Sequence, residues 1–285
     1  YYQRDGETIV EEKIGHIFST LTKNFIVNEG VPDVKRQTMV ERDELGSQPR
    51  YINCGNCIYD IEAGERLDHD PKYRCTLQVP WSYHKDAECP NFLEYLSETV
   101  YEEDIPVIQE MFGLCLYNDI PIQKAFMLVG EGGNGKSTLI NILKHLLGSE
   151  NYSSVELQDL SDNRFKVAEM EGKLANLAAD LPSRGLRDTA TFKKLTGEDT
   201  ISAERKNQDP FEFENFATMI NSANSLPETP DDSTAFFRRW MIISFPYKFV
   251  DDPTEEMEKE KDSELVSKLT REEEMEGILK WAIEG

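Results

Sequence analysis

Short apolar runs alternate with helical apolar spacing between residues 125 and 245 of this 285-residue chain. Apolar or β-favouring runs predict strands at 125–129, 173–179, 200–206, 211–216, 217–223 and 240–245. Apolar residues spaced three and four apart predict helices at 137–147, 188–196 and 231–237. This alternation indicates an α/β fold with a mainly parallel central sheet. Ligands of such sheets bind at the carboxyl ends of the strands.

The chain before this region shows a mixed pattern. An amphipathic helix is predicted within residues 7–29 from helical spacing of Ile14, Ile17, Phe18, Leu21 and Phe25. A polar stretch at 34–49 predicts a loop, and turn residues between β-favouring pieces predict short strands and turns at 50–90. Helices are expected at 91–101 and 105–117. We therefore expect a smaller mixed α+β N-terminal domain before the parallel sheet.

Composition limits the classes of function. No apolar run approaches the roughly 18 residues that span a bilayer, and no secretory signal opens the chain, so we expect a cytoplasmic protein without a membrane partner. The five cysteines are dispersed and are expected to be reduced. Cys54 and Cys57 form a C-x-x-C pair, but a second pair at metal-binding spacing is missing, which disfavours structural zinc. No Ser/His/Asp arrangement suggests a hydrolase triad.

The charge is strongly acidic and unevenly distributed. A net charge of −23 opposes binding of nucleic acid by the surface as a whole. Much of the acidic excess lies in the first 100 residues and at 251–276, where the run 255–260 is typical of a solvated helix face. Basic residues gather in the middle of the chain: Lys193, Lys194, Arg205, Lys206, Arg238 and Arg239. The local field, not the net charge, therefore decides whether a polyanion binds.

A glycine-rich loop directly follows the predicted strand at 125–129 and precedes the helix at 137–147. Its spacing is G-x-x-x-x-G-K-S, and its residues are Gly130, Glu131, Gly132, Gly133, Asn134, Gly135, Lys136, Ser137 and Thr138. In such a loop the backbone N–H groups and the helix N-terminus surround phosphates. Lys136 would reach the β- and γ-phosphates, and the Ser137 hydroxyl would hold Mg²⁺. The pattern predicts a nucleoside triphosphate site.

Two further polar residues end predicted strands. Asp180 follows the apolar run 174–179 and matches the Walker B pattern, in which a carboxylate lies near the metal. Asn224 follows residues 219–223, where its amide could orient the attacking water or simply form a turn before Leu226.

Five ordered blocks resemble the motifs of superfamily 3 helicases, in particular the primase-helicase type of phages, plasmids and poxvirus-like replicons. The blocks are GEGGNGKST (130–138), KLANLAADLP (173–182), FKKLTGEDTISAERK (192–206), ATMINSANSLP (217–227) and AFFRRWMIISFPYKF (235–249). The resemblance implies an AAA+ P-loop core at 91–250, which uses ATP and Mg²⁺. It also implies an N-terminal region of primase-helicase type at 1–90. An acidic helical segment at 251–285 would then start a truncated C-terminal region.

The resemblance also assigns roles to residues. Lys136, Asp180 and Asn224 would act at the phosphates, with Ser137 and Asp180 at the metal. An arginine finger from a neighbouring subunit would be Arg239 or, as second choice, Arg238. A ring of six subunits would thread single-stranded DNA past basic residues, led by Lys206 and followed by Arg205, Lys194 and Lys193. The paired acidic residues of many relatives are absent at Asp180, so the general base stays open between Glu204 and Asp199.

Relatives of this type are often fused to a primase-polymerase, so a fused or associated primase is an expected partner, and the host cytoplasm is the expected location. Three other functions stay open from the residues alone. The chain could be a P-loop ATPase that remodels proteins, a small-molecule kinase, or a scaffold that binds nucleotide without hydrolysing it.

Overall fold

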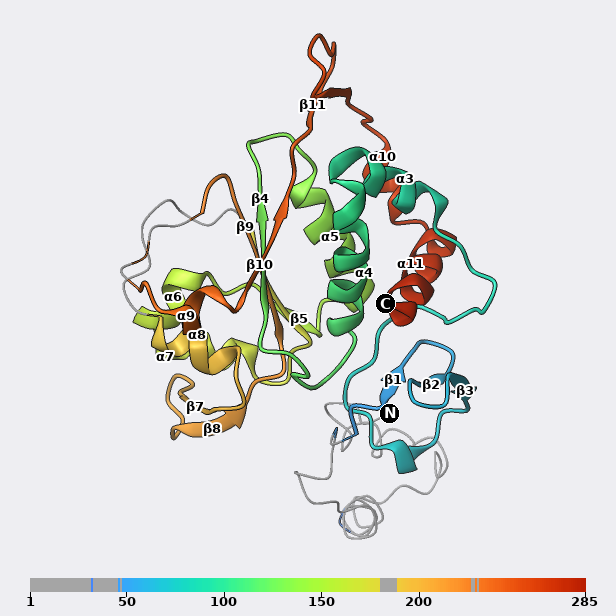
Figure 1. The fold of residues 1–285 in the computed structure, drawn as a ribbon. Coiled ribbons are helices and arrows are strands. Elements are labelled where there is room, and N and C mark those ends of the chain that lie inside the picture. The colour runs from blue at the N-terminus through green and yellow to red at the C-terminus, as the bar shows by residue number, and fades with distance from the viewer. Residues whose placement is uncertain (1–31, 33–45, 47, 180–188, 227–228, 230) are drawn as a thin grey trace, which may run out of the picture.

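The computed structural model describes residues 32, 46, 48–179, 189–226, 229 and 231–285 (Figure 1). The predicted helix at 7–29 and most of the predicted loop at 34–49 lie outside the described residues. Within the described part of the chain, no helix combines the length and apolar character needed to cross a bilayer.

A five-stranded parallel sheet forms the centre of the chain, with the strand order β10-β4-β9-β6-β5. In chain order its strands are β4 (Ala125–Val129), β5 (Tyr152–Ser153), β6 (Ala175–Ala178), β9 (Thr218–Ala223) and β10 (Trp240–Ser244). The predicted α/β class with a parallel sheet is confirmed. Because β9 and β10 flank β4, the segments that follow these three strands meet at one edge of the sheet.

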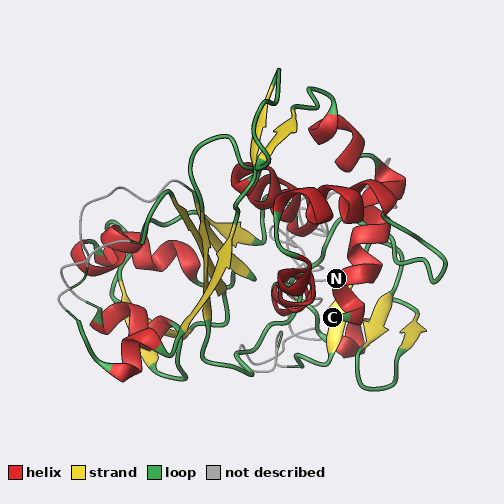
Figure 2. Cartoon of the chain, turned by 45° about the horizontal axis from the view of Figure 1, so that its top comes forward, coloured by secondary structure: helices red, strands yellow, loops and turns green. Residues whose placement is uncertain are grey.

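Helices cover both faces of the sheet, as Figures 1 and 2 show. One face carries α3 (Pro90–Thr99), α4 (Ile105–Leu114), α5 (Lys136–Leu147) and α11 (Glu272–Glu284). The other carries α6 (Leu157–Asp162), α7 (Arg164–Val167), α8 (Ala190–Leu195) and α9 (Thr234–Phe237). Phe126 and Leu128 of β4 enter the first core, while Met127 enters the second. Burial on both faces explains why β4 is a continuous apolar run.

Two antiparallel units accompany the sheet. The first is a meander of β1 (Tyr51–Asn53), β2 (Ile58–Asp60) and β3 (Glu65–Leu67), and the second is a hairpin of β7 (Thr200–Ala203) and β8 (Phe211–Glu214). The short strands predicted at 50–90 are therefore present. The described residues also contain 3₁₀ turns: η2 (Pro71–Tyr73), η3 (Glu102–Asp104) and η4 (Ala168–Met170). The meander region contacts the end of α5, where the Trp81 indole Nε1 donates to the His145 carbonyl at 2.8 Å.

The segment between α5 and β6 contains elements that the sequence pattern did not predict. These are β5, α6, α7 and η4, which are two, six, four and three residues long. Helical periodicity needs a window of about 11 residues to become visible, so helices of this length leave no clear signal.

The C-terminal part begins with an arm, which we define as residues 246–261. It contains β11 (Lys248–Val250) and β12 (Glu258–Glu260), which pair in parallel at the top of Figure 1. The prediction of a solvated helix face at 255–260 was wrong, because these residues form a turn and the strand β12. A run of charged residues indicates only that a segment is exposed to solvent, and an exposed strand can carry such a run as well as a helix can.

Two helices follow the arm, α10 (Leu265–Leu269) and α11. Trp281 of α11 packs edge-on against Phe92 and Phe112, with ring centroids 5.3 and 5.8 Å apart. Glu274 of α11 is buried, and its carboxylate accepts from the Phe92 backbone N–H at 2.8 Å and from the Asn91 side chain at 2.7 Å. The carboxylate therefore satisfies the N-terminus of α3, where a negative charge is favoured.

Candidate nucleotide and nucleic-acid sites

The glycine-rich loop connects β4 to α5, as predicted. Gly133 and Gly135 adopt φ values of 77° and 93°, a region that favours glycine. Gly135 is the N-cap of α5, so the N–H groups of the first helical turn point toward the loop. Ser137 lies in that turn and is exposed. This geometry suits anions, because both the free N–H groups and the helix dipole favour negative charge.

Lys136 is held by the loop itself. Its side chain is buried, and its Nζ donates to the carbonyls of Gly130 at 2.5 Å and Glu131 at 3.1 Å. It also donates to the Asn134 Oδ1 at 2.9 Å, while the Asn134 Nδ2 donates to the Phe245 carbonyl at 3.1 Å. Asn134 thus joins the ammonium group to the segment after β10. A phosphate that binds here would replace neutral carbonyls with a charged acceptor.

Two residues from distant parts of the chain support the loop from outside. The Tyr95 hydroxyl of α3 donates to the Gly135 carbonyl at 2.8 Å, and the Phe249 backbone N–H of β11 donates to the Gly133 carbonyl at 2.7 Å. Burial raises the pKa of Tyr95 far above its usual value, so the hydroxyl remains a donor at all physiological pH values. Both bonds use carbonyl groups of the loop and none of its N–H groups.

A cavity of ≈ 440 Å³ opens at this loop. Its walls come from four parts of the chain: residues 132–138, Tyr95, Asn224 and the segment that contains Phe249, Lys261, Asp262, Ser263, Leu265 and Val266. The structure therefore brings the sequence-predicted Asn224 to the loop, because β9 is the direct neighbour of β4. Asp180 lies outside the described residues, and the description of that strand's end stops at Ala179.

The described part of the site fits the phosphates of a nucleotide. A side chain at Gly130 would fill the loop, since an added Cβ would lie 2.0 Å from the Asn134 Nδ2. Within the described residues, no group of three His, Cys, Asp or Glu side chains could hold a metal. Mg²⁺ at nucleotide sites needs no such group, because phosphates and water supply most of its ligands.

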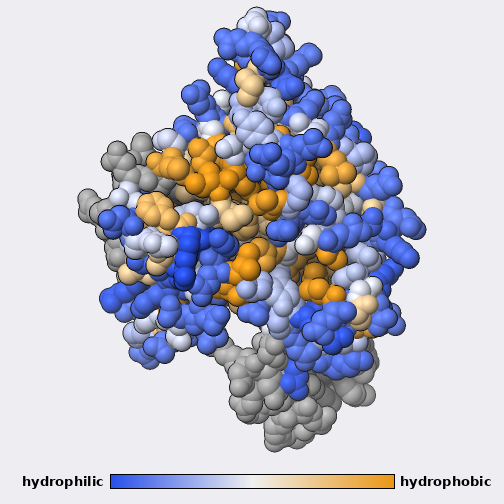
Figure 3. All heavy atoms as spheres, viewed as in Figure 1, coloured by the Kyte–Doolittle hydropathy of each residue, from blue (hydrophilic) through white to orange (hydrophobic). Residues whose placement is uncertain are grey.

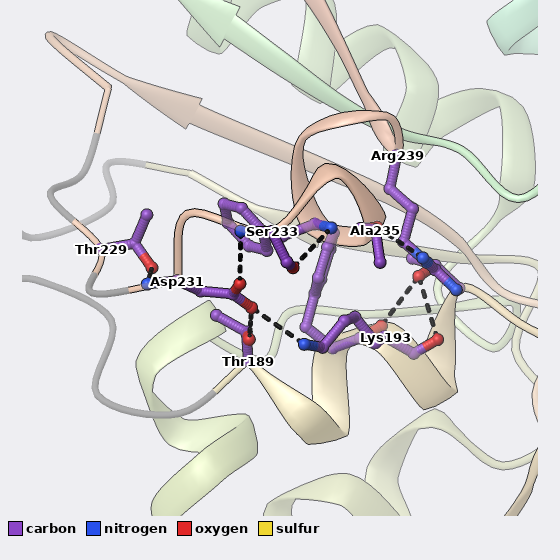
Figure 4. A network of polar contacts seen from close by, with 10 residues as sticks. Thr189, Lys193, Thr229, Asp231, Ser233, Ala235 and Arg239 are labelled. Carbon is purple, nitrogen blue, oxygen red and sulfur yellow. Dashed lines mark hydrogen bonds and ion pairs between the residues drawn. The ribbon is translucent and has the colours of Figure 1, made fainter.

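The arginine pair lies at the start of β10, next to α9 (Figure 4). Arg239 is buried; its Nη1 donates to the Ala235 carbonyl at 2.5 Å, and its Nε has no hydrogen-bond partner in the described structure. Burial and the neighbouring Arg238 lower the pKa of Arg239. Arg238 is exposed, and its guanidinium lies 3.4 Å from the Gln123 Oε1. The exposed member of the pair is therefore Arg238.

Lys193 belongs to a polar network that Figure 4 shows. Its Nζ lies 2.9 Å from the Asp231 Oδ2, and the same carboxylate accepts from the Thr189 hydroxyl and the Ser233 backbone N–H. Hydrogen bonds from Ser233, Thr189 and Lys193 hold the pKa of Asp231 well below its usual value. Lys193 therefore balances an anion within its own chain, whereas its neighbour Lys194 is exposed.

The hairpin of β7 and β8 carries the other predicted basic residues in its connecting turn. Lys206 is exposed there, next to Asn207, which turns the chain with a φ of 62°. Arg205 forms an ion pair with Glu171, and its guanidinium lies 4.4 Å from the centre of the Phe211 ring. The hairpin thus presents Lys206 outward and anchors Arg205 against the body of the protein.

The two candidates for the general base differ in their surroundings. Glu204 forms an ion pair with Arg164 at 2.9 Å, which occupies its carboxylate. Asp199 is exposed in the turn before β7.

Comparisons with known proteins bear on this geometry. Residues 6–100 match the family described as D5 N terminal like, and residues 128–239 match DUF5906, a family of unknown function. L207/L206 of Acanthamoeba polyphaga mimivirus, which carries a helicase name, is 26% identical over 223 residues, or 73% of this chain and 23% of that protein. These matches support the resemblance to superfamily 3 helicases of the primase-helicase type.

Solved structures agree with the fold of this chain. An apo structure of the NrS-1 C terminal region has a TM-score of 0.53 at 18% identity, covering 83% of this chain and 53% of that one. A second apo form has a TM-score of 0.52 at 19% identity over 71% and 46% of the two chains. The chain spans about a quarter of the curated mimivirus relative and about half of these structures.

Sequence reasoning missed two residues at the nucleotide site, Tyr95 and Phe249, and the particular role of a third, Asn134, which it had placed in the loop. Tyr95 and Phe249 reach the loop only through tertiary structure, and no local pattern marks them. Asn134 occupies a variable position of the motif, so the spacing that identified the loop carried no information on its role.

Proposed function

We propose that this chain is an ATP-driven DNA helicase that moves along single-stranded DNA as a ring, and that it is the helicase part of a larger primase-helicase replication protein. The observation that carries the proposal is the cavity shared by the glycine-rich loop, Lys136 and Asn224 at one edge of a parallel sheet. The helicase name of the mimivirus relative supports the same activity.

ATP would bind with its phosphates at the loop and with Lys136 on the β- and γ-phosphates. Ser137 and Asp180 would hold Mg²⁺, which neutralises charge that develops on the transferred phosphoryl group. Asn224 would orient the attacking water, since it lines the same cavity. Lys136 is already desolvated by burial, so its charge acts on a phosphate with little screening by water.

The arginine pair would act on the nucleotide of a neighbouring copy. Gly130 follows β4 and the pair precedes β10, and these strands are parallel and in register over five residues. Five residues span about 16 Å at roughly 3.3 Å each. The arginine pair of one chain therefore lies at the N-terminal ends of the parallel strands, and its glycine-rich loop lies at their C-terminal ends. Arg238, being exposed, is better placed than Arg239 to reach another subunit.

Contact between copies is also supported by the surface around β10, an edge strand. Figure 3 shows apolar side chains gathered over the region where β10 runs in Figure 1. Phe237 and Ile242 are 56% and 51% exposed there. An edge strand with exposed apolar residues favours burial against another chain. We propose that this face contributes to the interface of a ring, with six subunits as the expected number.

Single-stranded DNA would contact the basic hairpin through its phosphates. Lys206 is the leading contact and Lys194 follows; Arg205 and Lys193 are weaker, because Glu171 and Asp231 already balance their charges. Such contacts are sequence-tolerant and depend on salt. The net charge of −23 favours a second candidate, an ATPase that remodels proteins, because an acidic surface disfavours DNA elsewhere on the molecule.

Steady-state ATP hydrolysis with and without single-stranded DNA separates the two candidates. For the helicase we expect stimulation by DNA, loss of hydrolysis in Lys136→Ala, and loss of stimulation in Lys206→Ala, with the exposed Lys85→Ala as a matched control. Unstimulated hydrolysis together with unchanged DNA binding in Lys206→Ala would instead favour the remodelling ATPase. Mixing Arg238→Ala with Lys136→Ala subunits should restore some hydrolysis, and none at any ratio would refute action between subunits.

A further inference from the structure

One wall of the cavity at the glycine-rich loop is apolar and would make no favourable contact with phosphates. This wall consists of three apolar residues, Phe249 of β11 and Leu265 and Val266 of α10. Val266 remains 42% exposed, although it is a large apolar side chain beside a cavity. Phosphate oxygens gain nothing from such a wall, whereas a flat heteroaromatic ring gains both contact area and stacking.

We propose that Phe249, Leu265 and Val266 form a base seat, which holds the purine of the nucleotide whose phosphates bind the loop. This inference rests on the proposed function and adds the residues that select the base. One residue links the two ends of the site: the Phe249 backbone N–H donates to the Gly133 carbonyl at 2.7 Å, and Phe249 also lines the cavity. The arm therefore fixes the position of the base seat relative to the loop.

The charges around the cavity set the direction of the nucleotide. A second cavity of ≈ 470 Å³ adjoins the first, and the two share Tyr95, Phe249, Lys261, Asp262, Ser263 and Leu265. The rest of its lining contains three acidic residues of α3 and β12, Glu94, Glu98 and Glu260, together with Asn91 and with Lys268, whose ammonium group is paired with Asp262. Carboxylates repel a triphosphate, so the phosphates belong at the loop and the uncharged base at the arm.

The size of the ring then decides which base gains most. Apolar contact strengthens with the area removed from water, and a purine offers two fused rings where a pyrimidine offers one. The cavity volume of ≈ 440 Å³ lies within the range of about 300–1,000 Å³ typical of sites for small organic ligands. The base seat therefore favours a purine nucleotide over a pyrimidine nucleotide.

Calorimetric titration with ATP, CTP and inorganic tripolyphosphate, each with Mg²⁺, tests the base seat. We expect Phe249→Ala to weaken ATP binding by about 5- to 150-fold, the loss found when a base loses an aromatic partner. Val266→Ser should weaken ATP binding by a smaller factor, because it removes apolar contact and no stacking partner. The affinity for CTP should fall less than the affinity for ATP. The affinity for tripolyphosphate should stay unchanged, which would also show that the loop is intact. Met257→Ala is the matched control, because Met257 is an exposed apolar residue of the same arm and lines neither cavity.

Two results would overturn the base seat. One is unchanged ATP affinity in both variants, and the other is an equal loss for ATP and tripolyphosphate, which would mean that these residues only support the loop. Lys136→Ala separates this failure from failure of the proposed function. It should weaken all three ligands, and if it weakens none, the loop is not the phosphate site at all.

Discussion

Gly130 and Gly132 belong to the same loop but have very different surroundings. A Cβ added at Gly130 would lie 2.0 Å from the Asn134 Nδ2 and 2.5 Å from the Phe245 carbonyl oxygen, whereas a Cβ at Gly132 meets nothing within 4 Å. Those two atoms form the 3.1 Å hydrogen bond that holds Asn134 beside Lys136. Gly130→Ala therefore pushes apart the contact that positions the lysine, and Gly132→Ala leaves it alone.

The size of the effect follows from two contributions. Forcing one carbon into a filled site costs about 1–3 kcal/mol, and losing the bond from Asn134 to Phe245 costs about 1 kcal/mol more. If the loop shifts to accommodate the methyl group, nucleotide affinity falls by the same 2–4 kcal/mol, which is roughly 30- to 1,000-fold. Calorimetric titration of both variants with ATP and Mg²⁺ measures the difference. Equal affinities for Gly130→Ala and Gly132→Ala would refute the account of Asn134 given above.

Three other substitutions test the packing of the chain. Glu274→Ala should lower the free energy of unfolding by about 2–4 kcal/mol, because it leaves the buried Phe92 N–H without an acceptor; denaturant titration beside the exposed control Glu273→Ala measures this, and equal losses would contradict it. Asn221→Leu should raise the same quantity by about 1–3 kcal/mol, since neither amide atom of this buried residue has a hydrogen-bond partner in the described structure; a loss would show that the amide is needed. The depressed pKa of Asp231 stabilises the folded state above the unfolded-state pKa of about 3.9, and this stabilisation is lost as the pH falls toward the folded-state value. Asp231→Asn should therefore make the free energy of unfolding fall less steeply as the pH is lowered below about 5. An unchanged fall would refute the conclusion that the network around Asp231 lowers its pKa.

The elements that sequence analysis predicted well are those whose signal is local. β4 and β9 are buried on both faces and so appear as apolar runs, and β10 is an apolar run although it lies at the edge of the sheet. α5 repeats its apolar residues at helical spacing up to Gly148. The glycine-rich loop is equally local, because its chemistry depends on the spacing of glycines and one lysine within nine residues. These patterns need no knowledge of what packs against them.

Contacts between distant segments left no such signal. The insertion of β9 between β4 and β6 brings Asn224 to the loop, yet nothing in the three strands specifies that order. Tyr95 and Phe249 reach the loop from α3 and β11, which are separated from it by 40 and more than 100 residues. Such contacts follow from the tertiary arrangement, so they became visible only with the structure.

The arrangement around α5 shows what these distant contacts do together. At its N-terminus, Tyr95 and Phe249 fix the carbonyls of Gly135 and Gly133. At its C-terminus, the Trp81 indole donates to the His145 carbonyl at 2.8 Å and satisfies an end group that would otherwise need water. The helix whose N–H groups would face phosphates in the proposed function is thus held at both ends by segments far away in sequence. If these supports keep the loop in shape without a ligand, the proposed phosphate binding would carry little ordering cost.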